Sequence, residues 1–209
     1  MTRRTLIAAC IAMLSLGGLR YPALAAAPAA GQVLASFGEC FVEAGGQRSA
    51  LRLGDPVHVG DTVDVAAGAK LKLRMNDGSV IAAASGTRLT IDNYAVGGDG
   101  QSRDAKLSLS GGLVRAVVAT FKEPSHFEVD TATAVAAVRS TDWFIDARPG
   151  ATQIGVLGGS VSLTSRATGK AVDIPARWGA RVEAGRDPVP ARVWTQAEFA
   201  DFIARTNLD

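Results

Sequence analysis

Few side chains in this sequence are suited to metal binding or covalent chemistry. It contains only two cysteines and two histidines. His58 and His126 lie far apart, and neither has a neighbour at the spacing of a metal ligand, so a zinc site of the Cys/His type has too few ligands. Cys40 is the only cysteine outside the first 25 residues, so we predict a buried thiol rather than a disulfide.

Long apolar runs are also scarce. The sequence has a single one, and it lies at the N-terminus. Arg3 and Arg4 precede an apolar run over residues 6–19, and residues 23–25 (Ala-Leu-Ala) follow it. This pattern predicts a signal peptide over residues 1–25, cleaved after Ala25. The run is short for a span of about 20 residues, which makes a retained anchor the weaker alternative. The two arginines fit either an ordinary secretory signal or a twin-arginine signal.

Clustered positive charge is missing from the remainder of the chain. The sequence has 22 basic and 20 acidic residues, and the predicted signal peptide takes away three arginines and no acid, so the net charge falls from +2 to −1. A nucleic-acid-binding protein needs a cluster of cations to displace counterions from phosphates. We therefore expect no nucleic-acid partner. We also expect no membrane span after cleavage, because the single long apolar run belongs to the predicted signal peptide.

A helical period is absent before residue 190, and short alternating segments take its place. Residues 70–75 alternate polar and apolar side chains, and residues 76–79 (Asn-Asp-Gly-Ser) are typical of a tight turn. We predict an all-β domain over residues 31–185. Its expected strands are residues 32–42, 63–65, 70–75, 88–92, 105–110, 113–120, 126–130, 134–139, 143–146, 153–157, 161–164, 171–174 and 180–183.

A weak internal similarity bears on the architecture. Residues 71–80, 107–114 and 154–161 each show an alternating strand, a glycine turn and a second strand, which we interpret as three hairpins. Their spacing is irregular, so they are not a strict repeat. Stacked hairpins fit a twisted β-solenoid and a β-sandwich equally well.

The last segment, residues 186–209, differs from the rest. Pro188 and Pro190 predict a stiff linker, and a helix follows in which Thr195 and Glu198 can form a capping box. Trp194 can pack on Phe199 at its first turn. We expect this helix to cover one open end of the core, and a partner-binding helix is the alternative.

Three short patterns resemble catalytic or metal sites without completing one. Residues 158–162 lack the last glycine of a nucleophile elbow, so we interpret them as a hairpin turn. Residues 97–102 begin like a calcium-binding nonapeptide but have Ser102 in place of an aspartate. Asp142 and Asp146 can face the same side of a strand, although we expect them to cap its two ends in water. We therefore expect no enzymatic activity and no cofactor.

One long segment resembles a known family. Residues 127–144 (FEVDTATAVAAVRSTDWF) are similar to a motif of the FecR family, F-x-V-x-T-P-x-A-x-x-x-V-R-G-T-x-F. Residues 53–63, 73–79 (LRMNDGS) and 159–163 (GSVSL) resemble its flanking motifs in the same order. Two departures stand out, since residues 132–133 replace a Thr-Pro continuation and Ser140 replaces the motif glycine. If that glycine needs a positive φ, Ser140 costs about 1 kcal/mol or marks a different turn.

The resemblance implies a β-solenoid-like domain that binds a protein. In the regulator after which the family is named, this domain lies in the periplasm and senses the signalling domain of an outer-membrane transporter, while a cytoplasmic segment acts on a sigma factor. We expect this chain to lack that segment and its anchor, so that only the interaction module carries over. Asp77, Gly78, Arg139, Thr141 and Trp143 match motif positions and are the candidate interaction residues. Arg139 is expected to bond loop carbonyls or Asp142.

Three functions from different classes stay open at this point. The first is an exported, non-enzymatic, periplasmic protein-interaction module with a signalling or scaffold role in the cell envelope. The second is a binding module for envelope glycans, with Trp143, Trp178 or Tyr94 as stacking platforms. An enzyme that uses Asp142 and Asp146 is the third and weakest hypothesis.

Overall fold

The structure is a computed structural model that describes residues 27–98, 100, 102–122 and 125–208. The predicted signal peptide at residues 1–25 lies outside these residues, so it stays a prediction. Among the described residues, no helix has the length and apolar character needed to cross a bilayer.

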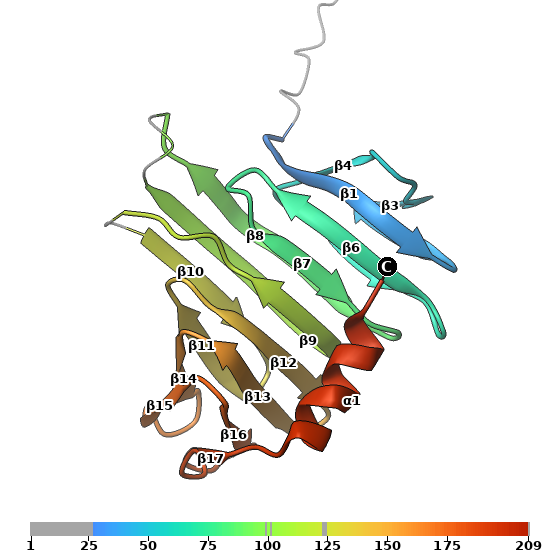
Figure 1. Ribbon diagram of the computed structural model, residues 1–209. Coiled ribbons are helices and arrows are strands. Elements are labelled where there is room, and N and C mark those ends of the chain that lie inside the picture. The colour runs from blue at the N-terminus through green and yellow to red at the C-terminus, as the bar shows by residue number, and fades with distance from the viewer. Residues whose placement is uncertain (1–26, 99, 101, 123–124, 209) are drawn as a thin grey trace, which may run out of the picture.

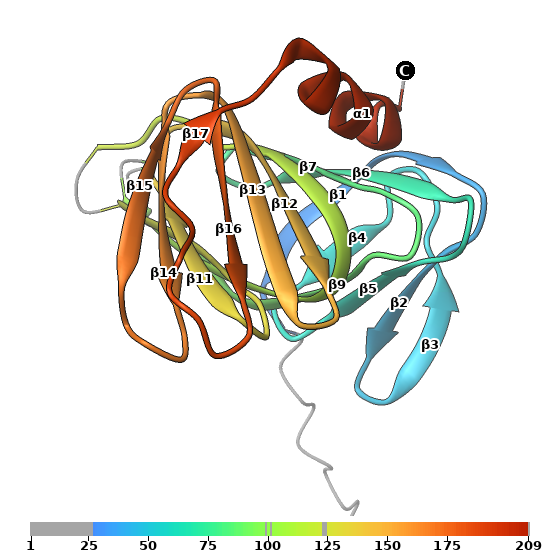
Figure 2. The same ribbon diagram turned by 90° about the horizontal axis from the view of Figure 1, so that it is seen from below.

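Two β-sheets lie face to face, and one helix crosses the outer side of the first (Figures 1 and 2). In spatial order, sheet A contains β4 (Pro56–His58), β1 (Ala29–Phe37), β6 (Lys70–Met75), β7 (Val80–Ala83), β9 (Arg103–Val117), β12 (Asp142–Arg148), β13 (Ala151–Gly158), β16 (Trp178–Glu183) and β17 (Arg192–Val193). Sheet B contains β3 (Gln47–Ala50), β2 (Cys40–Ala44), β5 (Thr62–Val65), β8 (Arg88–Val96), the first part of β9, β10 (Ser125–Asp130), β11 (Ala134–Val138), β14 (Ser160–Ser165) and β15 (Ala171–Pro175).

The all-β prediction with a short C-terminal helix is confirmed. Within the described part of the chain, β9 and β10 are the only strands that pair in parallel, and all other neighbours are antiparallel. Stacked parallel coils would mark a β-helix. Of the two architectures considered, the arrangement therefore resembles the sandwich.

The core lies between the sheets and follows from the alternation of the strands. In β6, Leu71 and Leu73 are buried while Lys70, Lys72 and Arg74 point outward. Each leucine buried in this way contributes roughly 1.5–3 kcal/mol. Cys40 is a free thiol in this core, as predicted, and burial raises its pKa.

Glycine corners carry the chain from one sheet to the other, and here two predicted hairpins are wrong. Only the segment at residues 71–80 forms a hairpin, between β6 and β7. Residues 107–114 belong to one continuous strand, β9, which passes from sheet B to sheet A at Gly112. Residues 154–161 connect β13 in sheet A with β14 in sheet B, so the turn at residues 158–160 is also a corner.

The corner in β9 requires a glycine. Gly112 has φ +98°, and a Cβ at this position would overlap the Cα of Thr87. The hydroxyl of Thr87 accepts a hydrogen bond from the Leu113 N–H and donates to the Leu113 carbonyl, which fixes the corner against the neighbouring loop. A similar corner at Gly38 divides the single strand predicted at residues 32–42 into β1 and β2.

The helix, α1 (Gln196–Thr206), packs on the outer face of sheet A through a second apolar cluster. Trp194, Phe199 and Phe202 lie against Leu113 and Phe144, separate from the main core. The predicted capping box is present, and Trp194 packs on Phe199 with ring centroids 5.3 Å apart. The helix was expected over an open end of the core, but the outward side chains of β9 and β12 form an apolar strip on the sheet face, and α1 covers that strip instead.

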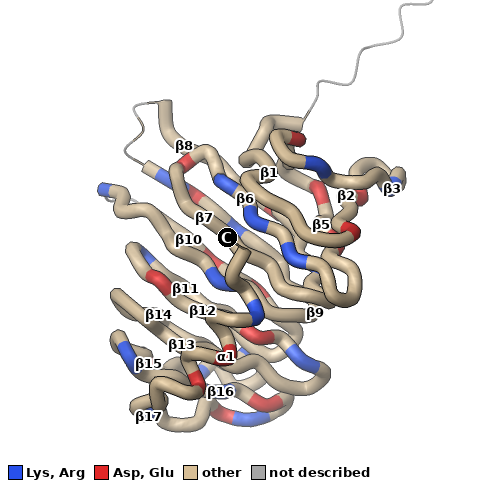
Figure 3. Tube along the Cα trace, turned by 45° about the vertical axis from the view of Figure 1, so that its right-hand side comes forward, with Lys and Arg blue, Asp and Glu red and all other residues tan. Residues whose placement is uncertain are grey.

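Two lysines of β6 hold the C-terminal end of the helix. The Lys70 ammonium donates to the carbonyls of Ala204 and Asn207, and Lys72 donates to the carbonyl of Leu208. Figure 3 shows the positive charge of β6 beside this end of the chain. Cations at a helix C-terminus interact favourably with its unpaired carbonyls. The alternation of β6 therefore supplies both core leucines and helix caps.

The N-terminal end of α1 is held by Glu198, which makes docking sensitive to acid. The ion pair with Arg192 and then the backbone N–H of Thr195 lower the pKa of Glu198 from 4.5 to about 2. Because the folded pKa lies below the unfolded one, this contribution to stability is complete above pH 4.5 and is lost as the pH falls towards 2. We expect amide exchange in α1 to rise over this range, and Glu198→Gln to remove that pH dependence. Equal acid responses in both proteins would contradict the assignment.

Candidate functional site

A fully buried ion pair lies at the turn between β6 and β7. The Asp77 and Arg103 side chains are both 0% exposed, and Asp77 Oδ2 lies 2.7 Å from Arg103 Nη1. Two charges taken out of water are tolerated only when nearly all of their hydrogen-bonding capacity is used. We call this pair and its partners the Asp77–Arg103 lock.

The Asp77 carboxylate accepts four hydrogen bonds. Its Oδ1 accepts from the Ser79 N–H and from the Tyr94 hydroxyl, each at 2.8 Å. Its Oδ2 accepts from the Ser79 hydroxyl and from Arg103, each at 2.7 Å. Burial, followed by the negative charge of Asp77, raises the pKa of Tyr94 far above its usual value of 10. Tyr94 is therefore a permanent hydrogen-bond donor in the lock.

The Arg103 guanidinium connects this turn to β10 and to the end of β11. Its Nη1 also donates to the Ala119 carbonyl, and its Nη2 donates to the Ser125 hydroxyl and to the Arg139 carbonyl. The rings of Phe121 and Phe127 lie on it, with centroids 4.9 and 5.3 Å from its central carbon. The lock thus joins segments that are distant in the sequence.

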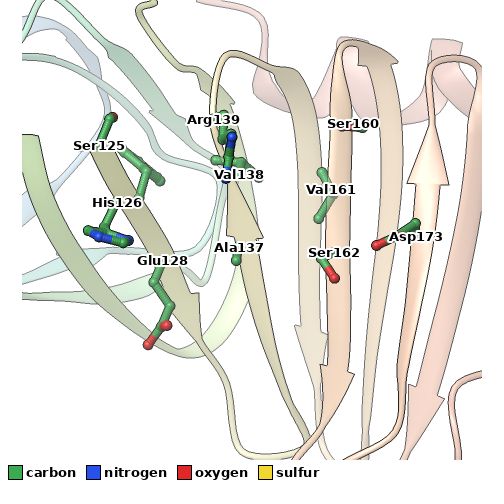
Figure 4. Close-up of a pocket in the computed structure, with 11 residues that line it drawn as sticks. Ser125, His126, Glu128, Ala137, Val138, Arg139, Ser160, Val161, Ser162 and Asp173 are labelled. Carbon is green, nitrogen blue, oxygen red and sulfur yellow. The ribbon is translucent and has the colours of Figure 1, made fainter. Parts of the chain in front are cut away.

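An open hollow of about 470 Å³ lies on the outer face of sheet B, over β10, β11, β14 and β15. Figure 4 shows the residues that line it. Its floor is made of small side chains, chiefly Ala137 and Ser162. Charged or polar side chains stand around them: His126, Glu128, Arg139 and Asp173.

The hollow and the lock share residues. Ser125, Phe127 and Arg139 line the hollow, and each also contacts the Arg103 guanidinium from below. The backbone of Arg139 is fixed by the lock, while its side chain is exposed. A rigid, buried polar network therefore supports one end of an exposed surface.

Comparison with known proteins identifies this part of the chain. Residues 61–162 match a family model described as FecR protein. These residues form a FecR domain. They include both partners of the lock and most of the hollow. A search of curated proteins finds no match to the chain.

Solved structures show the same fold. Two crystal structures of "a putative anti-sigma factor" from Parabacteroides distasonis ATCC 8503, at 1.65 and 2.50 Å resolution, each align with a TM-score of 0.55 and 15% sequence identity over 68% of this chain. The alignment spans 64% and 63% of those chains, which is less than two thirds of their length.

In the FecR domain, two of the recognised motifs meet at the lock. Asp77 and Ser79 come from the Asp-Gly-Ser motif, while the Arg139 carbonyl comes from the Arg-Ser-Thr motif. Gly78, which lies between Asp77 and Ser79, has φ +83° in the tight turn that connects β6 with β7. Arg139 was expected to bond loop carbonyls or Asp142, and the structure pairs Asp142 with Arg115 at 2.8 Å.

The third motif packs on the second. The Thr141 hydroxyl donates to the Ser160 carbonyl at 3.0 Å, and a Cβ at Gly159 would overlap the Ser140 carbonyl. Ser140 is not among the described residues with positive φ, where Arg177 is the only one that is not glycine. The replacement of the motif glycine by Ser140 therefore brings no strain from a positive φ.

Burial separates the predicted interaction residues. Asp77, Thr141 and Trp143 are buried, and only Arg139 of the predicted set presents a side chain to the hollow. Trp143 is 0% exposed and Tyr94 is 5% exposed, so the prediction that they are stacking platforms is wrong. Inward-facing positions of β12 and β8 place both rings in the core.

Arg103 was missed by the sequence interpretation, although a pattern could have revealed it. It has the same parity along β9 as the buried residues Ala105, Leu107 and Leu109. A basic residue on the inward face of a strand needs a buried carboxylate, and this requirement points to an acidic partner elsewhere in the chain.

Asp142 and Asp146, the candidate carboxylate pair, form ion pairs with different arginines. Asp142 binds Arg115, and Asp146 binds Arg148 at 2.7 Å and Arg205 of α1 at 3.7 Å. Asp146 was expected to be exposed to water, but its side chain is 2% exposed because α1 covers this part of β12. Two carboxylates already paired in this way do not form an acid–base site.

The remaining candidate metal sites receive no support from the geometry. Within the described ranges, no group of three or more His, Cys, Asp or Glu side chains is placed to hold a metal. His58 Nδ1 lies 3.5 Å from Asp61, and His126 stands at the hollow. The loop at residues 97–102 includes two positions, 99 and 101, that lie outside the described residues.

Proposed function

We propose that the chain is exported to the periplasm and acts there as a non-enzymatic FecR interaction module in envelope signalling. The observation that carries this proposal is that the FecR motifs contribute both buried and exposed side chains. The Asp77 and Ser79 side chains are used internally by the lock, whereas the Arg139 side chain is presented outward at the hollow. The anti-sigma description of the structural neighbours favours a signalling role.

The glycan alternative has less support. Trp178, the one proposed platform that is not buried, is 36% exposed and lies beside Val193 at the edge of sheet A. Glycan sites use aromatic faces as flat platforms, and one partly covered ring offers little surface for stacking.

Capture of a partner from cells tests the proposal. The tagged protein is expressed in its own host, cross-linked in the periplasm and purified, with N-terminal sequencing to check cleavage after Ala25. We expect a specific protein partner whose recovery falls about tenfold in Ala137→Arg, because a long side chain then fills the floor of the hollow. Arg181→Glu, on the exposed face of sheet A, is the matched control and should retain the partner.

Two outcomes would count against the proposal. Retention of the precursor in the cytoplasm would contradict the periplasmic role, and recovery of no protein above an untagged control would contradict the interaction role. Equal recovery with Ala137→Arg would leave the interaction role intact and move the contact away from the hollow.

A further inference from the structure

The strand register arranges the side chains of the hollow in two rows. In one row, Glu128 lies opposite Ala137, Ala137 opposite Ser162, and Ser162 opposite Asp173. Phe127 lies opposite Val138, so His126 and Arg139 follow one residue further along and form the next row on the same face. The two rows are therefore separated by two residues along the strands.

The rows differ in charge. The first row has a carboxylate on each side of its small floor, from Glu128 and Asp173. Glu128 is oriented by Lys106 at 3.0 Å and its side chain remains 37% exposed. The second row carries the Arg139 guanidinium and the N–H donors of His126. The hollow thus has an acidic end and a basic end.

The dimensions suit a single extended chain. Glu128 and Asp173 are three strands apart, which corresponds to roughly 14 Å between their backbones. Between them lie only Ala137 and Ser162. In an extended chain, side chains on one face recur every second residue, about 6.6–6.8 Å apart, which equals the separation of the two rows. A helix would need apolar anchors at i, i+3 and i+4, and the floor offers it no such apolar groove.

We propose that the hollow binds an extended segment of the partner protein with an acidic side chain at one position and a basic side chain two residues away. The acidic side chain lies at Arg139 and His126, and the basic one lies between Glu128 and Asp173. This inference rests on the proposed function and specifies the chemistry of the partner. A polyanion does not fit, because two carboxylates border the same site.

Four hairpin-constrained peptides test the inference. Their exposed strands carry Glu-x-Lys, Lys-x-Lys, Glu-x-Glu or Ala-x-Ala, and each is titrated into the ¹⁵N-labelled exported protein by NMR. We expect Glu-x-Lys to shift the amides of Ala137 and Ser162 and to bind about fivefold more tightly than the other three. Arg139→Glu should reverse the order in favour of Lys-x-Lys, since the hollow is then lined by the carboxylates of Glu128, Asp173 and the new glutamate. Arg181→Glu should leave the order unchanged.

The outcomes separate this inference from the proposed function. Equal binding of all four peptides, or no shifts at Ala137 and Ser162, would overturn the inference even if a partner is captured from cells. The expected order of affinities without any captured partner would support the inference and overturn the proposed interaction role.

Discussion

Replacing Arg103 with methionine is expected to lower the free energy of unfolding by about 3–5 kcal/mol. The substitution replaces the apolar stem of the arginine with one of similar length but removes the guanidinium, which leaves the Asp77 carboxylate buried without its counterion. It also removes the donors to the Ser125 hydroxyl and to the carbonyls of Ala119 and Arg139. Urea unfolding followed by circular dichroism measures the change.

Two further variants make this result specific to the lock. Asp77→Asn combined with Arg103→Met removes both charges, and we expect the double variant to be more stable than Arg103→Met alone. Lys106→Met removes the ion pairs of an exposed ammonium with Glu128 and Asp130, and its cost should stay below about 1 kcal/mol because Asp130 keeps its ion pair with Arg166. If Arg103→Met were no more destabilising than Lys106→Met, the lock would have no major role in stability.

The strands of this fold could be predicted because their alternation is strong, but their partners could not. Residues 70–75 show which side chains face the core without any knowledge of the neighbouring strands. The pairs at residues 107–114 and 154–161 have the same local pattern as a hairpin, yet each connects two sheets. A glycine with positive φ serves both a hairpin and a corner, so the difference depends on tertiary packing alone.

Only part of the candidate site could be predicted, because local sequence patterns do not show which strands pair. The motifs identified Asp77 and Arg139 as residues with a special role, and the structure brings them to the same buried arginine. The hollow could not be predicted, because it depends on the register between β10, β11, β14 and β15. Ala137 and Ser162 occupy unspecified positions within the motif segments, and Asp173 lies outside them, so the sequence does not single out any of the three.

The lock explains how a small exposed site can be held in place on a sheet. Edge and surface positions of a sheet have few contacts to fix them, whereas the Arg139 backbone is bound from below by Arg103 and the nearby Thr141 by the Ser160 carbonyl. Rigid support of this kind reduces the conformational entropy that a contact surface loses on binding. The lock therefore supports a surface that the FecR motif segments themselves present, since Ala137, Arg139 and Ser162 all lie in those segments.

Gly179→Ala is expected to release α1 from sheet A. Trp194 lies across Gly155 and Gly179, and a Cβ at Gly179 would overlap its indole ring. Overpacking of this kind costs about 1–3 kcal/mol. The cost should appear as faster amide exchange in α1 and as a lower melting temperature. Gly158→Ala is the matched control, because a Cβ at Gly158 meets no atom within 4 Å.

A double-mutant cycle decides whether the Trp194 ring causes this effect. Trp194→Ala removes the ring and should cost about 3–5 kcal/mol by itself, since the ring packs against Phe199 and Phe202 at 5.3 Å. Once the ring is gone, the three atoms nearest to the new Cβ are gone as well, so the double variant should be no less stable than Trp194→Ala. Additive losses would show that Gly179 is required for the backbone of β16 rather than for the helix, and that α1 does not depend on this contact.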